Sequence, residues 1–452
     1  MSRRPIRIAV VGSGPAGVYA AAALTDRDEV CVDVIDRLPT PFGLVRYGVA
    51  PDHEKMKSVA VALRRVLEHD RVRFLGNVEL GRDVSVEDLH RYYHAVVVAN
   101  GAAVDRRLGI PGEDLPGSFS ATEFVAWYSG HPDSALDQFT LTAETVIVVG
   151  VGNVAIDVAR VLCKTADELR PTDIPDHVLA VLSHSRVREV SIIGRRGPVQ
   201  AKFTTKELRE LGELANADVI VRPDDLQLDE ASEEAVKNDA VVRRNLDVLR
   251  GWSERTPEGR SRRLHIRFLL RPVGIIGQGA VTGMDLARGH LDGHGRANDT
   301  GKSMTLPAQM VLRSVGYRGI PMPGLPFDEE KGIIPNFSGR ILRDGAPAPG
   351  EYVAGWIKRG PSGIIGTNKH DANETVRCLF EDIARLPSPE AREPDGVIDL
   401  LRQRRVRVVP WEGWEAIEAL EIASGRARGA RQVKLAEREL LLAAALSREI
   451  AT

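Results

Sequence analysis

Short apolar runs along the chain alternate with glycine-rich turns and helical stretches. The run Ile6 to Val11 is followed by the turn Gly12-Ser-Gly-Pro-Ala-Gly17, by an alanine-rich stretch that ends at Leu24, and by a second apolar run from Val30 to Ile35. A strand, a glycine turn, a helix and a second strand in this order are typical of a βαβ unit. We therefore predict such a unit at the start of the chain, with Asp36 at the end of its second strand.

The same pattern returns near Thr145. The strand-like run to Val149 leads into Gly150-Val-Gly-Asn-Val-Ala155 and a helix to about Cys163, but the next strand, Val190 to Ile193, comes late. Gly150 and Arg195 are 45 residues apart, whereas the usual separation is about 20 residues. This spacing predicts an insertion at about residues 164–186, after the first helix.

Two apolar runs end in glycine where the chain could leave one domain for another. Ala95 to Gly101 ends in Asn-Gly, and Val311 to Gly316 is followed by a proline-rich loop. We predict an α/β fold with two nucleotide-binding Rossmann-like domains, of which the second is inserted into a discontinuous first domain. The first domain would comprise residues 1–103 and 318–452, and the inserted domain residues 104–317.

The C-terminal tail has helix-forming composition with apolar spacing. This applies to Ala416 to Ala423 and to Val433 to Ile450. We interpret both stretches as packing or covering helices without a site of their own.

The composition is that of an ordinary globular protein, with 43% hydrophobic and 27% charged residues and a net charge of -2. No apolar run reaches the roughly 18 residues of a membrane span, and the first strand begins too early for a signal or transit peptide. The cysteines Cys31, Cys163 and Cys378 lie far apart, which excludes a redox CxxC pair and the usual iron-sulfur ligand spacing. We expect a cytoplasmic protein and no metal site.

The first glycine turn fits a dinucleotide. Gly12 allows the tight turn, Gly14 lets the backbone approach a pyrophosphate, and Gly17 lets helix and strand pack closely. Asp36, which lies 19 residues beyond Gly17, would accept hydrogen bonds from ribose hydroxyls. The position at the start of the chain favours FAD, and the alternative is an ordinary tight turn of an α/β protein.

The second glycine turn has different chemistry. Ala155 stands in place of the third glycine, and the following strand ends in Arg195 and Arg196 where a carboxylate would favour NAD. Two guanidinium groups can pair with a 2′-phosphate, so we predict NADP(H). The inserted domain would then be the NADP domain, and the discontinuous one the FAD domain. Glu207 lies close enough downstream to belong to the same site. The alternative is a solvated arginine pair at a strand end.

Two dinucleotide sites in one chain imply hydride passage from a nicotinamide to a flavin. The acceptor of the electrons stays open between a small iron-sulfur protein and a small molecule, as in an NADPH-dependent diaphorase or quinone reductase. A redox-sensing protein that binds both cofactors without turnover is a third possibility.

An arginine-rich stretch bears on this choice. Nine arginines and three acidic residues lie between Ala240 and Pro272, which gives a local charge of +6 in a chain of net charge -2. We interpret the stretch as a docking surface for an acidic ferredoxin, with contributions from Arg243, Arg244 and Arg250. The alternative is a solvated face.

The stretch Pro39-Thr-Pro-Phe-Gly-Leu-Val-Arg-Tyr-Gly-Val-Ala-Pro-Asp-His53 closely resembles the signature of the adrenodoxin reductase-type ferredoxin-NADP reductases. Further matching stretches begin at Gly152, Gly194, Phe203, Arg313 and Gly355, so the resemblance spans positions 6 to about 380. It implies FAD, NADP(H) and electron transfer to a ferredoxin.

The resemblance also implies roles for individual residues, which it assigns in three groups. Those lining the FAD are Ala16, Asp36, Leu44 and Val78, with Trp356, Gly363, Ile364 and Ile365 at the isoalloxazine. Those at the NADP are Gly152, Asn153, Val154 and Ala155 for the pyrophosphate, Arg195 and Arg196 for the 2′-phosphate, and Glu207 and Gly363 to complete the site. The polar positions near the redox centre are His53, Asp157 and Glu207, which would orient the nicotinamide and hold water.

Overall fold

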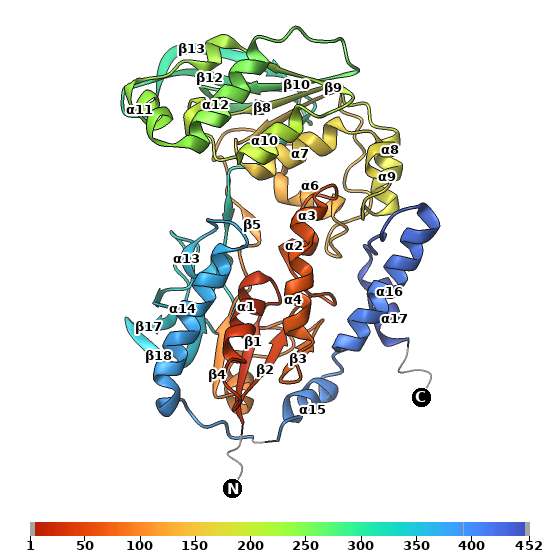
Figure 1. Cartoon of the computed structure of the whole chain (residues 1–452), viewed down its shortest axis with the longest axis vertical. Helices are drawn as coiled ribbons and strands as arrows, with labels where there is room; N and C mark the ends of the chain where they lie inside the picture. Colours follow the sequence, from red (N-terminus) through yellow and green to blue (C-terminus); the bar gives the residue numbers. More distant parts are fainter. Residues whose placement is uncertain (1–4, 392, 448–452) are drawn as a thin grey trace. The chain divides into compact units, whose positions relative to one another are not determined.

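The computed structural model describes residues 5–391 and 393–447. Within this range the chain divides into two compact units (Figure 1). The first comprises residues 5–104, 129–133 and 317–447, and the second comprises residues 105–128 and 134–316. The chain passes between the units at β5 (Val104–Asp105) and again at β15 (Tyr317–Arg318), and these two short strands pair with each other.

The first unit contains a seven-stranded sheet in the order β16-β17-β18-β4-β1-β2-β3. The strands from β18 to β3 are parallel, whereas β16, β17 and β18 form antiparallel pairs. The strand bounds are β1 (Ile6–Val11), β2 (Val30–Ile35), β3 (Val72–Leu75), β4 (Ala95–Val98), β16 (Asn336–Phe337), β17 (Arg340–Arg343) and β18 (Ala346–Val353).

The parallel strands of the first unit are mostly apolar because both faces of the sheet are covered. In β1, Ile8 and Val10 face one hydrophobic cluster, and Ala9 and Val11 face another. The first cluster includes side chains of α1 (Pro15–Leu24), α4 (Val59–Leu67), α14 (Thr367–Asp382), α16 (Trp411–Arg428) and α17 (Arg438–Leu446). The second includes side chains of α5 (Val86–Tyr92), α13 (Trp356–Arg359) and α15 (Gly396–Gln403). The remaining short helices are α2 (Leu44–Tyr47), α3 (Glu54–Lys57) and η3 (Ile383–Arg385).

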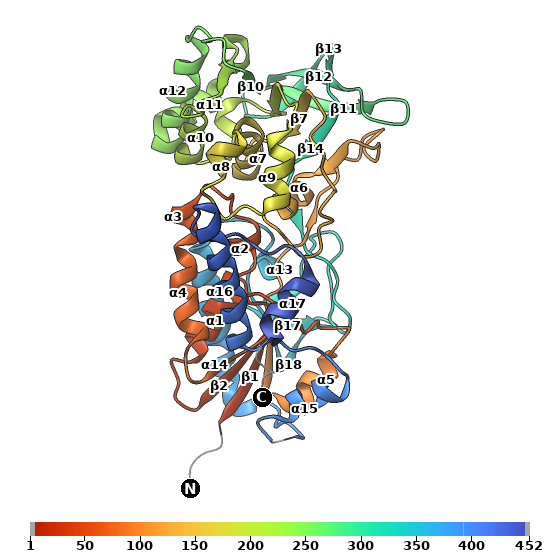
Figure 2. The same ribbon diagram turned by 90° about the vertical axis from the view of Figure 1, so that its right-hand side faces the viewer.

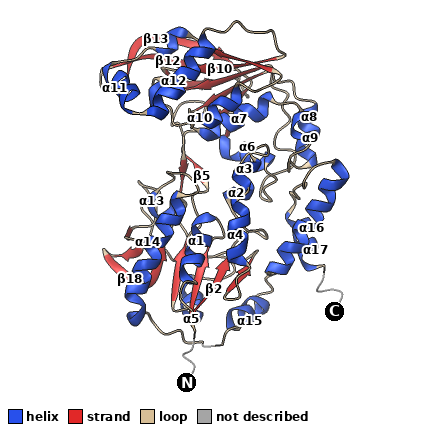
Figure 3. Ribbon diagram, in the orientation of Figure 1, coloured by secondary structure: helices blue, strands red, loops and turns tan. Residues whose placement is uncertain are grey.

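The second unit contains a six-stranded sheet in which every pair is parallel, in the order β6-β14-β7-β8-β10-β9. Next to it lies a three-stranded antiparallel sheet. Figure 3 distinguishes these strands from the helices of the unit. The strand bounds are β6 (Ser118–Ser120), β7 (Thr145–Val149), β8 (Glu189–Ile193), β9 (Ala217–Val221), β10 (Arg262–Arg267), β11 (Leu270–Ile276), β12 (Gly283–Leu291), β13 (Ala297–Pro307) and β14 (Met310–Arg313).

The two faces of the parallel sheet of the second unit are covered differently. In β7, Val146 and Val148 belong to a cluster with the helices, whereas Ile147 and Val149 belong to a cluster with β11 and β12. The helices are α6 (Ala121–Tyr128), α7 (Asn153–Cys163), α8 (Ala166–Leu169), α9 (Asp176–Ser183), α10 (Thr205–Leu211), α11 (Glu230–Asn238) and α12 (Ala240–Ser253), with the short turns η1 (Pro198–Gln200) and η2 (Pro223–Leu226). Helices α8 and α9 fill the insertion predicted between α7 and β8.

The C-terminal tail differs from the prediction in one place. Helices α16 and α17 pack against each other (Figure 2), but α17 begins at Arg438 and not at Val433, and the predicted end at Ile450 lies outside the described residues. The N–H groups of Val433 and Leu435 donate to the backbone oxygen and the carboxylate of Glu421, respectively, so this segment is tied to α16 in an extended form. Among the described helices, none is long and apolar enough to cross a membrane.

Candidate functional site

The first glycine turn lies at the carboxyl end of β1, between the ends of β2 and β4. Gly12 has φ +112°, its N–H donates to the Ile35 carbonyl at 2.7 Å, and a Cβ here would lie 2.5 Å from the Ala99 oxygen. A Cβ on Gly17 would lie 1.8 Å from the Gly12 oxygen. Both positions therefore require glycine for close backbone packing, which places the N-terminus of α1 directly over the sheet edge.

Gly14 is different because its surroundings are open. A Cβ added there would meet only the Gly43 Cα, at 3.9 Å. Nearby, the buried Oδ1 of Asn100 has no hydrogen-bond partner within the described part of the chain, and Asn100 follows β4 and touches the Gly12 turn. An open backbone cradle at a helix N-terminus, with an unsatisfied polar atom beside it, fits a dinucleotide pyrophosphate and its sugar. Asn100 was not among the site residues predicted from the sequence, and its only sequence signal was the Asn-Gly end of an apolar run.

Asp36 organises the turn. Its Oδ2 accepts hydrogen bonds from the Ser13 N–H at 2.7 Å and the Ser13 hydroxyl at 2.5 Å, and its Oδ1 accepts from the Leu38 N–H at 2.9 Å. A carboxylate has about four acceptor sites, so capacity for a ribose hydroxyl remains. Asp36 thus also stabilises the glycine turn, a structural role that the sequence did not reveal.

The segment after β2 closes around this turn. The Phe42 N–H donates to the Ser13 carbonyl at 3.0 Å, which brings α2 to the glycine turn. Leu44, the first residue of α2, has 40% of its surface exposed, whereas Val78 is buried and its N–H donates to the Asp36 carbonyl at 2.8 Å. Leu44 is therefore available to a ligand, and Val78 supports the position of Asp36.

A second loop at the same sheet edge follows β18. Gly355 has φ +80°, and its missing Cβ would lie 2.5 Å from the Cβ of Ala16, so this loop touches the start of α1. The Trp356 ring lies 5.4 Å from the Tyr317 ring between centroids, and its Nε1–H donates to the Ser362 carbonyl at 3.2 Å. The structure thus brings Trp356 and Ala16 to the same edge as the glycine turn.

Residues 363–365 form the turn that enters α14. Gly363 has φ +82° and packs against Thr367, whose Oγ1 accepts from the Ile364 N–H at 3.2 Å. The Ile364 side chain is 69% exposed, and Ile365 packs on the core. A large exposed apolar side chain beside the first turn of a 16-residue helix is suited to contact an aromatic ring system.

Beneath this turn lies a buried charge cluster that the sequence analysis missed. Asp371 accepts from the Gly355 N–H at 2.5 Å and pairs with Lys358 at 3.1 Å, while Lys358 also pairs with Glu374 at 2.6 Å. The Lys358 side chain is only 6% exposed. This cluster fixes Gly355 and its neighbours to α14.

In the second unit, the Gly150 turn follows β7. Gly150 has φ +131°, and its Cβ would lie 2.0 Å from the Ser314 oxygen at the end of β14. A Cβ on Gly152 would meet nothing within 4 Å. Ala155 is fully buried and Val154 packs on the same core. The open position at Gly152 and the free start of α7 fit a second pyrophosphate in the same way as Gly14.

The start of α10 is tied to this turn. The Asn153 Oδ1 accepts from the Thr204 N–H at 2.8 Å. Glu207, in the first turn of α10, is buried, and its Oε2 has no hydrogen-bond partner among the residues described. Asp157 on α7 accepts from the buried Arg160 at 2.8 Å. An unsatisfied buried carboxylate oxygen at this place fits a ligand that donates a hydrogen bond.

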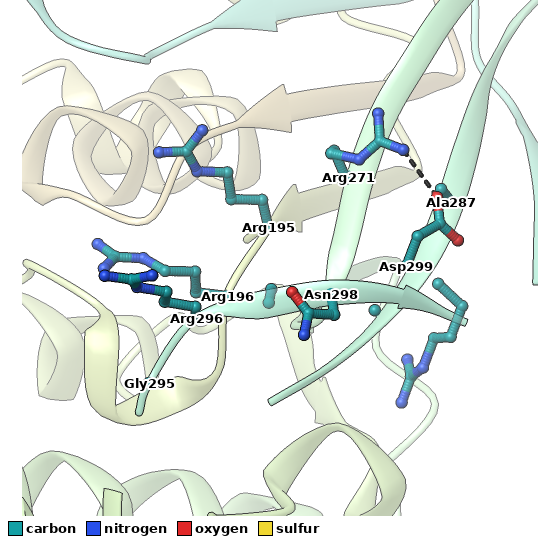
Figure 4. A pocket seen from close by; sticks show the side chains of 11 residues that line it. Arg195, Arg196, Arg271, Ala287, Gly295, Arg296, Asn298 and Asp299 are labelled. Carbon is teal, nitrogen blue, oxygen red and sulfur yellow. Dashed lines mark hydrogen bonds and ion pairs between the residues drawn. The ribbon is translucent and has the colours of Figure 1, made fainter. Parts of the chain in front are cut away.

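Arg195 and Arg196 follow β8 and line a cavity of about 320 Å³ (Figure 4). The opposite wall comes from the three-stranded sheet, which brings three further arginines that the sequence analysis did not select as site residues: Arg271, Arg288 and Arg296. They lie far from Arg195 in the sequence, and only the pairing of β11 to β13 reveals them.

His53 belongs to the first unit, whereas Asp157 and Glu207 belong to the second. The His53 side chain is buried, with its Nδ1 3.3 Å from the Met56 sulfur. The joint role of these three residues stays a prediction.

The arginine-rich stretch from Ala240 to Pro272 divides into two groups, and this corrects the interpretation of the whole stretch as one surface. Five of its nine arginines have partners inside the unit: Arg260 with Glu258, Arg262 with the Lys164 and Val187 carbonyls, Arg263 with Glu189, Arg267 with Asp225, and Arg271 with Asp299. The other four have no carboxylate partner among the described residues: Arg243, Arg244 and Arg250, which are exposed on α12, and Arg255, which is exposed just after it. The local charge of +6 therefore overstates the free charge.

Comparison with known proteins identifies the family. Residues 6–224 match the pyridine nucleotide-disulphide oxidoreductase family. Over 455 residues the chain is 46% identical to the NADPH-ferredoxin reductase FprA of Mycobacterium tuberculosis, covering 97% of this chain and 99% of that protein. It is 43% identical to the mitochondrial NADPH:adrenodoxin oxidoreductase of Arabidopsis thaliana, covering 98% and 96%.

A solved structure agrees with this similarity. Mycobacterium tuberculosis FprA in complex with NADPH superimposes with a TM-score of 0.93 at 46% identity, over 98% of this chain and 100% of that one. Identity of this level over nearly the full length of both chains confirms the resemblance seen in the motifs. The chain belongs to the adrenodoxin reductase-type family of ferredoxin-NADP reductases.

Proposed function

We propose that the two units of this chain bind different cofactors. The chain is an FAD- and NADPH-dependent oxidoreductase that transfers electrons to a ferredoxin. The first unit binds FAD and the second binds NADP(H). Each domain predicted from the sequence is thereby given its cofactor, FAD for residues 1–103 and 318–452 and NADP(H) for residues 104–317. The observation that carries it is the difference after the two glycine turns: the strand after the first turn is followed by Asp36, whereas the strand after the second turn is followed by Arg195 and Arg196.

In the first unit, the Gly12 and Gly14 backbone would hold the FAD pyrophosphate, and Asp36 the ribose. Ala16, Leu44 and Val78 would line the cofactor, with Trp356 and residues 363–365 at its ring. When bound, FAD supplies the step between a two-electron hydride donor and a one-electron acceptor. The N-terminus of α14 carries partial positive charge toward this loop, which favours negative charge on the flavin.

In the second unit, residues 152–155 would hold the NADP pyrophosphate, and Arg195 and Arg196 the 2′-phosphate. Glu207 would accept a hydrogen bond through its unsatisfied oxygen. Arg160 would orient the Asp157 carboxylate, and His53 would act with these groups on the nicotinamide. Positioning supplies most of the rate of hydride transfer, so none of these side chains needs to act as an acid or base.

The acceptor we propose is an acidic ferredoxin that docks on α12. Arg243 and Arg250 are seven residues apart and therefore share one face of this helix, and their guanidinium groups have no carboxylate partner in the part of the chain that the structure describes. A small quinone would need no such surface.

We also propose a cytoplasmic location, which agrees with three cysteines that form no disulfide.

Anaerobic mixing separates these acceptors. The NADPH-reduced protein is mixed with an acidic ferredoxin or with a small quinone, and the flavin and iron-sulfur absorbances are followed together. We expect one ferredoxin to be reduced per electron, with a second-order rate constant that exceeds that of the quinone at low salt. Faster reduction of the quinone would support the diaphorase alternative. A yellow protein that NADPH does not bleach would overturn the assignment as an enzyme.

A further inference from the structure

The cavity at Arg195 and Arg196 contains two kinds of arginine. Arg271 pairs with Asp299 at 2.8 Å, as Figure 4 shows. Arg288 pairs at 2.5 Å with Asp225, whose side chain is 1% exposed. Both guanidinium groups are therefore held in ion pairs, Arg271 with Asp299 and Arg288 with a carboxylate that it shares with Arg267.

The other three arginines of the cavity are not held in such ion pairs. Arg195, Arg196 and Arg296 line it, and within residues 5–391 and 393–447 none of them has a carboxylate partner. In Figure 4 their guanidinium groups extend toward the same side of the cavity, away from the Arg271–Asp299 pair. Three like charges at one cavity repel one another, and an anion with several oxygens relieves that repulsion.

Arg296 is held in place by its own turn. The Asp292 carboxylate accepts from the N–H groups of His294 and Arg296, at 2.9 and 3.1 Å, and the Asp292 N–H donates to the Arg296 carbonyl at 3.0 Å. These bonds lower the pKa of Asp292 and keep it ionised. The Gly295 N–H donates to the Asp229 carboxylate at 2.9 Å, which ties the turn to α11.

The loop that carries Arg195 and Arg196 is fixed to the same sheet. The Arg196 carbonyl accepts from the Leu269 N–H at 3.0 Å, and the Leu269 carbonyl accepts from the Gly289 N–H of β12 at 2.8 Å. A Cβ on Gly197 would lie 3.0 Å from the Leu291 side chain, so the loop and the end of β12 are in close contact. The arginines thus come from two elements that are locked in register within one unit.

We infer that Arg296 is a third phosphate-binding arginine, which completes the 2′-phosphate site of NADP(H) from the β12–β13 turn. The inference rests on the proposed assignment of this cavity to NADP(H). A phosphate has three terminal oxygens, and a guanidinium from a second wall reaches oxygens that the Arg195-Arg196 loop leaves free. Arg296 therefore determines specificity for NADP(H) over NAD(H), together with the pair that follows β8.

The test uses calorimetric titration of the FAD-loaded full chain with adenosine 2′,5′-bisphosphate and with adenosine 5′-monophosphate. The variants are R296Q, R296K and R196Q, with K302Q as the matched control, because Lys302 is an exposed cation on β13 outside the cavity. We expect R296Q to weaken binding of the bisphosphate about tenfold, in the range of R196Q, with R296K between R296Q and the wild type.

Each outcome has one meaning. A bisphosphate affinity of R296Q within twofold of that of K302Q, while R196Q is weakened, would overturn the role of Arg296 and leave the NADP(H) assignment standing. A wild-type protein that binds the bisphosphate no more tightly than the monophosphate would overturn the assignment of the cavity itself. Weakening in R296Q and R196Q but not in K302Q supports both.

Discussion

At the scale of single residues, Gly14 and Gly17 are both part of the predicted motif but have different physical roles. A Cβ at position 17 would lie only 1.8 Å from the Gly12 oxygen, whereas the nearest atom to a Cβ at position 14 is the Gly43 Cα, at 3.9 Å. We expect Gly17→Ala to destabilise the FAD-free protein by about 1–3 kcal/mol, as overpacking does. Gly14→Ala should leave that stability unchanged and lower FAD affinity, because the added methyl occupies the cradle. Urea unfolding of the FAD-free protein and flavin titration measure the two effects, and equal stabilities of the variants would contradict this reading.

Asp105 gives a pH-dependent prediction at the same scale. Burial raises the pKa of Asp105 to about 6, despite opposing hydrogen bonds from Ser120 and Thr122 and the charge of Arg313. In the unfolded chain the pKa is about 3.9, so the folded protein holds a proton that the unfolded chain loses between about pH 4 and pH 6. Stability therefore falls as the pH rises through this window and is level above it.

The corresponding variant is Asp105→Asn, which keeps an oxygen acceptor for the Thr122 N–H. We expect it to raise stability at pH 8 by on the order of 2 kcal/mol and to have no effect at pH 4, where the wild-type carboxyl is also neutral. Thermal unfolding at the two pH values measures this, with the exposed Asp26→Asn as control. An equal gain at both pH values would show that ionisation is not the cause.

At the scale of elements, the C-terminal helix α16 holds the segment that carries Leu44. Glu421 on α16 and Arg46 on α2 form a buried pair at 2.5 Å with side-chain exposures of 0% and 4%. Glu421→Gln leaves the Arg46 charge without its partner, which costs about 3–5 kcal/mol. We expect this variant to release FAD at lower urea concentrations than the wild type. Glu418→Gln removes a partly exposed partner of Arg64 from the same helix and should change stability by less than about 1 kcal/mol.

The elements next to the glycine turns could be predicted from the sequence, because strand, turn and helix follow one another within about 30 residues. β1, β2 and β7 have the expected bounds. The start of α17 was wrong because bonds to Glu421, a residue on another helix, override the helical composition of residues 433–437. Arg296 and Asn100 were missed for the same reason, since their surroundings come from residues distant in the sequence.

At the scale of the whole molecule, charge is distributed so that docking depends on a few residues. The chain has a net charge of -2, so it does not attract an acidic ferredoxin as a whole. Five of the nine arginines of the basic stretch are satisfied internally, which leaves the exposed arginines of α12, with Arg255 beside them, as the steering charges. Steering by a local patch raises the association rate at low ionic strength and is screened by salt.

We therefore expect a triple glutamine variant of Arg243, Arg244 and Arg250 to reduce ferredoxin at least tenfold more slowly than the wild type at 10–20 mM salt, and to lose most of the salt dependence. The control variant loses three exposed arginines that already pair with a carboxylate one helical turn away: Arg170, Arg385 and Arg402. Both variants have the same net charge, so stopped-flow rates across a salt series separate local docking from a general charge effect. Equal slowing in the two variants would show that the net charge, and not α12, governs the encounter.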